Sequence, residues 1–153
     1  MELLQEFFLP CLWAFWASVA FGLVYDTHGG GILICGLGGA LGWLVYLLMQ
    51  QLPTGNILAA FIAAAAIAVF SECMARLRRC PVTGYLQVAL LPLVPGSGIY
   101  YAMRYCVAGE NELFLSTLFN TFGMAASLAV GAMLASTLVR IVMPHIPRLK
   151  NKN

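Results

Sequence analysis

Hydrophobic residues fill five long stretches of the chain, and short polar segments separate them. The stretches cover about residues 7–25, 32–52, 57–74, 85–107 and 113–143. Each is close to, or longer than, the roughly 20 residues that a helix needs to cross a bilayer. This pattern predicts an all-α integral membrane protein with five transmembrane helices, in which residues 1–153 form a single transmembrane domain.

The fourth hydrophobic stretch contains a segment that a regular helix does not accommodate. Pro92 and Pro95 lack a backbone donor and clash with helix built before them, and Gly96 and Gly98 readily leave helical geometry. We therefore predict that the fourth helix is broken near the bilayer midplane, over residues 92–98. Irregular backbone is tolerated there only where protein buries it or where it lines a wet cavity. Carriers hold substrates at such breaks, and a purely structural kink is the alternative.

Charged residues are scarce along the whole chain. They make up 9% of it, against about 25% in soluble domains, whereas 61% of the residues are hydrophobic. The cysteines are scattered without metal-ligand spacing, and His28 and His145 stand alone. The chain carries no recognisable nucleophile or carboxylate-pair motif. We expect no enzyme activity, no metal or other cofactor, and no nucleic-acid partner.

The few charges are distributed unevenly. Seven of the eight basic residues lie after the third stretch or at the C-terminal end: Arg76, Arg78, Arg79, Arg140, Arg148, Lys150 and Lys152. Five crossings place these two groups on the same side of the membrane, and cytoplasmic segments collect Lys and Arg. The acidic residues of the N-terminus and of the turn at Glu110 fall on the other side. We predict that the N-terminus is outside and the C-terminus inside.

Residues in and after the break are candidates for substrate binding. A helix that restarts near Gly98 presents free N–H groups and the positive end of its dipole, which suits a carboxylate. Arg104 either attracts an anionic substrate or extends to the outer interface. Asn120, in the fifth stretch, either contacts substrate or forms hydrogen bonds between helices. The substrate-binding candidates are Pro95, Gly96, Ser97, Gly98, Tyr100, Arg104 and Asn120.

Two carboxylates are candidates for proton coupling, because ionisable groups at membrane depth are costly and therefore functional suspects. Glu72 lies near the cytoplasmic end of the third stretch, and Asp26 follows the first. Each also has a simpler interpretation. Glu72 pairs on the helix surface with Arg76, four residues later, and Asp26 is an interfacial residue.

Small residues form rows at a spacing of four. Gly38 and Gly42 form one row in the second stretch, and Gly123, Ser127 and Gly131 form another in the fifth. Such rows let helices approach closely, either within a chain or between subunits. The third stretch is so rich in alanine that we expect protein on all its sides, which suggests a homo-oligomer or a larger partner.

The segment from Val94 to Tyr100, with Ala102 and Met103 just after, resembles the P-G-x-x-x-Y signature of the threonine/serine exporter family. The chain is similar over nearly its whole length to the small-subunit form, which corresponds to the C-terminal membrane half of full-length exporters. The resemblance implies a larger membrane subunit as partner and coupling to the proton gradient. It also implies threonine and serine as substrates, or succinate as in split two-subunit members.

These observations lead to one main hypothesis and two alternatives. The main hypothesis is a small subunit of a two-component secondary exporter in a bacterial inner membrane, which moves a small carboxylate or amino acid. The first alternative is a structural or assembly subunit in which the break only serves packing. The second is a homo-oligomeric channel, which would transport without a larger partner.

Overall fold

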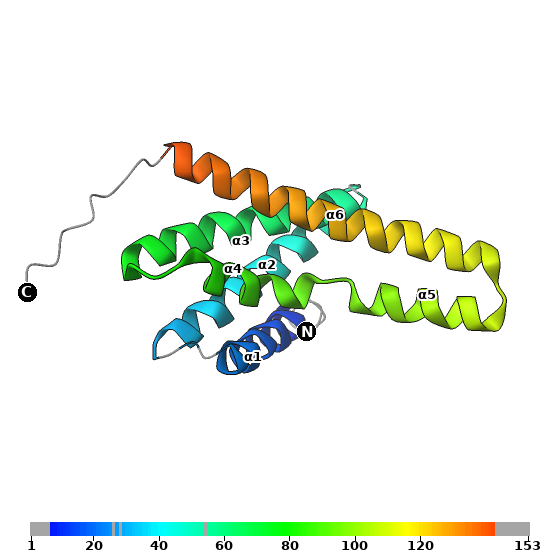
Figure 1. The fold of residues 1–153 in the computed structure, drawn as a ribbon, viewed down its shortest axis with the longest axis horizontal. Coiled ribbons are helices and arrows are strands. Elements are labelled where there is room, and N and C mark those ends of the chain that lie inside the picture. The colour runs from blue at the N-terminus through cyan, green and yellow to red at the C-terminus, as the bar shows by residue number, and fades with distance from the viewer. Residues whose placement is uncertain (1–6, 26, 28, 54, 143–153) are drawn as a thin grey trace, which may run out of the picture.

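The computed structural model of the protein describes residues 7–142, except residues 26, 28 and 54, and its secondary-structure elements there are all helices. In chain order they are α1 (Leu9–Val24), α2 (Gly31–Gln50), α3 (Asn56–Arg78), α4 (Val82–Leu90), the short 3₁₀ helix η2 (Leu91–Leu93), α5 (Gly96–Ala108) and α6 (Asn111–Val142). Figure 1 shows their arrangement. The predicted all-α fold is confirmed.

Three of these helices are long and apolar enough to cross a membrane, namely α2 with 20 residues, α3 with 23 and α6 with 32. The pair formed by α4–η2 and α5 passes the same test together and is bent by 48°, either as a broken span or as a re-entrant loop. The apolar helix α1 is shorter, with 16 residues. Each predicted stretch therefore coincides with one helix or with the bent pair, and the chain is a multi-pass membrane protein.

Glycines allow α2 to lie close to helices on two of its faces. On one face, a Cβ added to Gly36 would lie 2.7 Å from the ring of Phe15 in α1. On the other face, a Cβ on Gly38 would lie 3.0 Å from Ala89 in α4, and one on Gly42 would overlap with Ile67 in α3. The predicted row of Gly38 and Gly42 thus serves packing within the chain.

The alanines of α3 are covered by the chain itself. Ala59, Ala60, Ala63, Ala64 and Ala68 are fully buried in the main hydrophobic core. The helices that pack on α3 are α2, α4 and α6. Three neighbouring helices bury these alanines, because small side chains let helices approach closely. The homo-oligomer or larger partner that the alanines suggested stays a prediction.

Helices α3 and α6 run parallel to each other. Ile57, at the start of α3, meets Gly123 and accepts a hydrogen bond from the Ser127 hydroxyl at its carbonyl oxygen. One turn further, a Cβ on Gly131 would lie 2.6 Å from the backbone oxygen of Phe61. The predicted row of small residues in α6 is therefore the surface that packs on α3.

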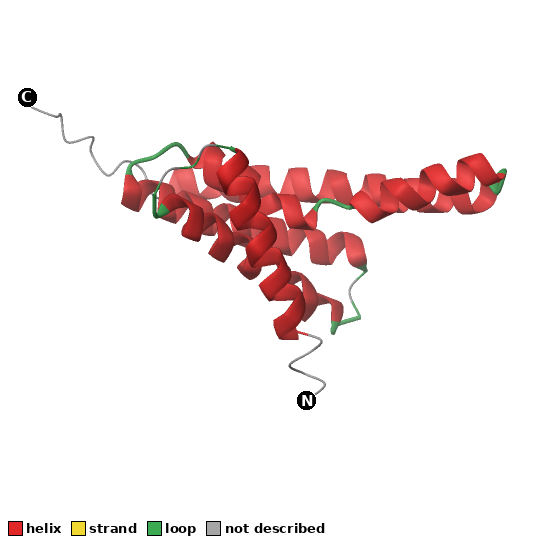
Figure 2. Cartoon of the chain, turned by 90° about the horizontal axis from the view of Figure 1, so that it is seen from below, coloured by secondary structure: helices red, strands yellow, loops and turns green. Residues whose placement is uncertain are grey.

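Helix α5 and the first third of α6 form a projecting pair, which we call the arm and which consists of α5 and residues 111–122. In Figures 1 and 2 the arm extends away from the other helices. Because Gly123 faces the first turn of α3, residues 111–122 extend about 18 Å beyond that helix. Many hydrophobic side chains of the arm are exposed, including Tyr100, Met103, Val107, Phe119 and Phe122.

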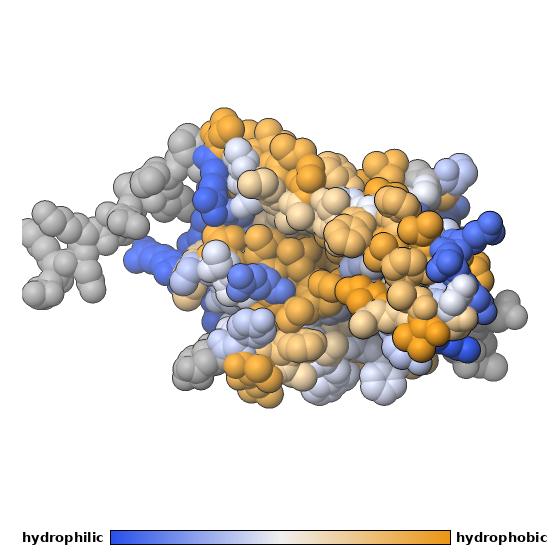
Figure 3. All heavy atoms as spheres, turned by 45° about the vertical axis from the view of Figure 1, so that its right-hand side comes forward, coloured by the Kyte–Doolittle hydropathy of each residue, from blue (hydrophilic) through white to orange (hydrophobic). Residues whose placement is uncertain are grey.

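The surface is hydrophobic between two hydrophilic ends. Figure 3 shows orange side chains over most of one face and blue side chains at both extremities of the molecule. This is the distribution expected when the middle of the protein faces lipid or other membrane proteins.

Candidate functional site

The break lies between η2 and α5 and is built around Pro95. Val94 is extended, with φ −62° and ψ 128°, and Pro95 has φ −76° and ψ 62°. The amide of Gly96 donates to the carbonyl oxygen of Val94 over 2.7 Å, which closes an inverse γ-turn. The ring of Pro95 holds φ at the value that this turn requires. The predicted break is therefore confirmed, and it is one tight turn rather than a long unwound segment.

The start of α5 leaves backbone donors free. The first helical hydrogen bond across the break runs from the Ile99 amide to the Pro95 oxygen, over 3.3 Å. In the described part of the chain, the amides of Ser97 and Gly98 have no backbone acceptor, and no side chain caps this helix. Gly96 and Ser97 are exposed. The positive end of the α5 dipole thus lies at exposed backbone and carries two unpaired amides, which is an arrangement that binds anions.

Gly98 joins the break to α6. A Cβ at this position would overlap with the hydroxyl of Thr121, which is buried and donates to the Thr117 carbonyl oxygen over 2.7 Å. Gly98 therefore serves helix packing, whereas a Cβ on Gly96 would meet nothing within 4 Å. Thr121 was missed from the sequence, because a single threonine on a long helix does not reveal which neighbour it faces.

The other substrate candidates lie on the surface of the arm. Tyr100 is exposed and its ring packs edge-on against Tyr101, with centroids 5.4 Å apart. Arg104, about 9 Å along α5 from Gly98, is also exposed. Asn120 is exposed beside Thr121. The chain therefore brings Pro95, Gly96, Ser97 and Gly98 together but does not enclose them with Tyr100, Arg104 or Asn120.

The charged ends of α6 locate the break along the molecule. Glu112 and Arg140 lie about 42 Å apart along this helix, and Thr121, beside the break, is about 14 Å from Glu112. Relative to α6, the break is thus nearer to the acidic end than to the basic end. Its depth in a bilayer, which we expected near the midplane, stays a prediction.

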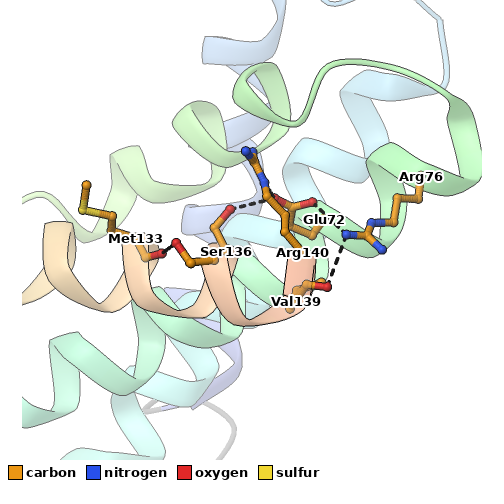
Figure 4. A network of polar contacts seen from close by, with 7 residues as sticks. Glu72, Arg76, Met133, Ser136, Val139 and Arg140 are labelled. Atoms are coloured by element: carbon orange, nitrogen blue, oxygen red, sulfur yellow. Dashed lines mark hydrogen bonds and ion pairs between the residues drawn. The ribbon is translucent and has the colours of Figure 1, made fainter. Parts of the chain in front are cut away.

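A second polar cluster surrounds Glu72 at the opposite end of α3. Glu72 is 2% exposed. Its carboxylate accepts hydrogen bonds from the Ser136 hydroxyl over 2.6 Å and from Arg140 Nε over 2.8 Å. Arg76 lies 3.7 Å from the other carboxylate oxygen and donates to the Val139 carbonyl oxygen over 3.3 Å. Figure 4 shows the carboxylate between the two arginines and Ser136.

The structure changes the interpretation of both carboxylate candidates. Glu72 does form the expected ion pair with Arg76, but the pair is buried between α3 and α6 rather than on a helix surface. Ser136 and Arg140 were missed, because their part in the cluster depends on the parallel packing of two helices distant in sequence. The Glu72 cluster lies about 25 Å from the break along α6. Asp26 lies outside the described residues.

Neither region has the composition of a metal centre. Among the described residues, no three His, Cys, Asp or Glu side chains lie close enough together to hold a metal ion. The groups at the break are suited to binding an anion, and those of the Glu72 cluster form ion pairs.

Comparison with known proteins assigns the chain to a family. Residues 10–138 match the family model described as threonine/serine exporter, ThrE. No curated protein and no solved structure matches the chain. The matched region contains the bent pair and its break, the Glu72 cluster except Arg140, and nearly all of the described helices. The chain belongs to the threonine/serine exporter family, which is a family of transporters.

Proposed function

We propose that this chain is the small membrane subunit of a two-component secondary exporter, in a bacterial inner membrane, that moves small carboxylates or amino acids. The observation that carries the proposal is the exposed start of α5, where the break leaves the Ser97 and Gly98 amides free beside the Ser97 hydroxyl. Succinate, threonine and serine are the candidate substrates, and each carries a carboxylate.

The geometry of the break suits a carboxylate for three reasons. The α5 dipole favours negative charge at its first turn. The free amides supply directed donors. Gly96 has no side chain, so a substrate reaches the backbone without steric obstruction. Carriers with discontinuous membrane helices use half-helix N-termini in this way.

The exposure of the arm supports a second membrane chain as partner. Unpaired backbone donors cannot face hydrocarbon without a cost of several kcal/mol each. The unpaired amides of Ser97 and Gly98 therefore require a protein surface or a wet cavity beside them. A larger membrane subunit that packs against the arm supplies both, and the site then lies between the two chains.

Coupling to the proton gradient belongs to the same proposal. The candidate carriers are Glu72, Asp26 and carboxylates of the partner. Glu72 receives hydrogen bonds or ion pairs from three side chains, so it accepts a proton only when these contacts open. Proton transfer at Glu72 would then be linked to separation of α3 and α6 near Arg140.

Deletion strains test the two-component proposal. We expect cells that lack this chain, the partner or both to accumulate the same substrate to the same extent, because neither chain forms the site alone. Intracellular succinate, threonine and serine are measured in each strain by mass spectrometry. Export by this chain without the partner would instead indicate a homo-oligomeric channel.

Substitutions at the break test the site itself. The double variant Pro95→Ala, Gly96→Ala removes the turn and adds a methyl group beside the free amides, so we expect export to fall to the level of the deletion strain. Gly84→Ala is the matched control, because Gly84 is also an exposed glycine with nothing within 4 Å of an added Cβ. Copurification of the partner verifies assembly. Normal export by an assembled double variant would favour the structural alternative.

A further inference from the structure

The C-terminal ends of α3 and α6 form a strongly basic end of the molecule. The described charges there are Arg76, Arg78, Arg79, Arg140 and Glu72, which together give a net charge of +3. The remaining acidic side chains in the described part of the chain, Glu110 and Glu112, lie at the tip of the arm. The positive charge at this end is therefore not neutralised by the part of the fold that the structure describes.

Two of these arginines are held in defined positions. Arg140 donates from Nε to the buried Glu72, and the same carboxylate is fixed by Ser136. The Arg140 side chain is nevertheless 63% exposed, whereas that of Arg76 is 22% exposed. Glu72 thus engages the inner edge of the Arg140 guanidinium, and most of that side chain remains accessible. A guanidinium fork that is already oriented loses less entropy when it binds a phosphate.

Hydrophobic side chains lie directly beside this basic cluster. Leu138, Ile141 and Val142 on the last turns of α6 and Leu77 on α3 are all strongly exposed. Inorganic phosphate gains nothing from contact with these hydrophobic side chains, whereas the acyl chains of a phospholipid can pack against them. Basic pockets between helix ends at a membrane surface are known to hold anionic lipid headgroups.

We propose that Arg140 and Arg76 form a binding site for the phosphate of an anionic phospholipid, with Glu72 and Ser136 positioning Arg140. The phosphate accepts hydrogen bonds from the exposed guanidinium of Arg140, with the charge of the partly buried Arg76 beside it, and the acyl chains lie along the exposed end of α6. Arg78 and Arg79 raise the local positive potential without direct contact. The lipid then stabilises the contact between α3 and α6, because it bridges residues of both helices.

The competing explanation is a diffuse positive surface that attracts any anionic lipid. Two variants separate a built site from a diffuse one. Arg140→Lys keeps the charge but loses the planar fork. Glu72→Gln raises the net charge of the cluster and replaces the charged acceptor that orients Arg140 with a weaker, neutral one. A diffuse surface binds equally well after the first change and more tightly after the second. A built site binds more weakly in both cases.

The experiment is a lipid titration of the full-length chain, purified in detergent with any subunit that accompanies it, followed by native mass spectrometry. The probes are phosphatidylglycerol, phosphatidylcholine and inorganic phosphate. We expect phosphatidylglycerol to bind selectively, and Arg140→Gln to lower its affinity about tenfold, as the loss of a charge-assisted hydrogen bond does. Arg104→Gln, which removes the same charge from the arm, serves as the control and leaves the affinity unchanged.

Several results would overturn the proposal. Equal loss in Arg140→Gln and Arg104→Gln would show a nonspecific charge effect, and full affinity in Arg140→Lys would show a diffuse surface. Equal binding of phosphatidylcholine, or displacement of the lipid by inorganic phosphate at constant ionic strength, would exclude a phospholipid site. If the Glu72→Gln variant does not fold, the affinity of the Arg140→Lys variant alone distinguishes a built site from a diffuse positive surface. Export measurements are independent of this titration, so neither result depends on the proposed transport function.

Discussion

At the scale of single residues, Glu72 is a buried charged group that contacts side chains from two helices. A carboxylate at 2% exposure inside an apolar helix requires compensation, and Ser136, Arg140 and Arg76 provide it from two helices. Removing one member of a buried ion pair is costly, because the partner keeps its charge without a counter-charge. The cluster therefore ties the end of α6 to α3.

Replacement of Glu72 by alanine should destabilise the protein. The change removes the hydrogen bonds from Ser136 and Arg140 and leaves Arg76 partly buried, so we expect a loss of about 1.5–3 kcal/mol, which is the range for hydrogen bonds to charged groups. Thermal unfolding of the purified protein measures it. Glu112→Ala at the exposed tip of α6 is the control and should change the midpoint little. Equal midpoints for the two variants would contradict a tie between the helices.

Sequence reasoning reached Glu72 and its pairing with Arg76 but not its partners on α6, for a physical reason. The pairing with Arg76 is local, four residues away on one helix, and any helix places such residues together. Ser136 and Arg140 are 64 and 68 residues away. Their approach depends on the relative direction and rotation of α3 and α6, which no local rule determines.

At the scale of elements, glycine positions decide how closely the helices approach. The Phe61 carbonyl oxygen occupies the space beside Gly131, and a backbone atom cannot move aside as a side chain can. Gly84 on α4 has open space instead. The same substitution should therefore have opposite consequences at these two positions.

We expect Gly131→Ala to destabilise the protein by about 1–3 kcal/mol, the usual cost of overpacking. Gly84→Ala should be neutral or stabilising by up to about 1 kcal/mol, because alanine is the better helix former. Unfolding midpoints of both variants under one set of conditions test the difference. A stable Gly131→Ala protein would mean that α3 and α6 are further apart than the structure shows.

The elements themselves were largely predictable. Proline and glycine act locally, so the break could be placed from residues 92–98 alone, and hydrophobic stretches located every helix. The small-residue rows were recognisable as packing surfaces, but the helices that they face were not. Gly98 is an example. The sequence predicts a flexible residue of the break at this position, whereas in the structure Gly98 allows α5 to pack closely against Thr121 of α6.

At the scale of the whole molecule, the fold places basic and acidic residues at opposite extremities, as the predicted topology requires. The basic residues of α3 and α6 lie at one extremity and Glu110 and Glu112 at the other, with hydrophobic surface between (Figure 3). The orientation in the membrane, with the C-terminus inside, stays a prediction from the positive-inside rule.

Cysteine labelling tests that orientation. In a variant without other cysteines, we expect Glu110→Cys to react with a membrane-impermeant maleimide in intact cells. A variant that retains only Cys80, which is exposed beside the basic end, should react only after the cells are permeabilised. Labelling of both variants in permeabilised cells controls for reactivity. Labelling of Cys80 in intact cells would show that the protein has the opposite orientation in the membrane.

The parallel packing of α3 and α6 limits how many times the chain can cross the membrane between these two helices. Two neighbouring spans that point the same way must be joined by an odd number of passages through the membrane. Between Arg78 and Asn111 the chain offers only the bent pair of α4–η2 and α5. That pair must therefore make one full passage, because a re-entrant loop would return α6 to the wrong face. The turn at Pro95 is thus a joint within a continuous path from one face of the membrane to the other.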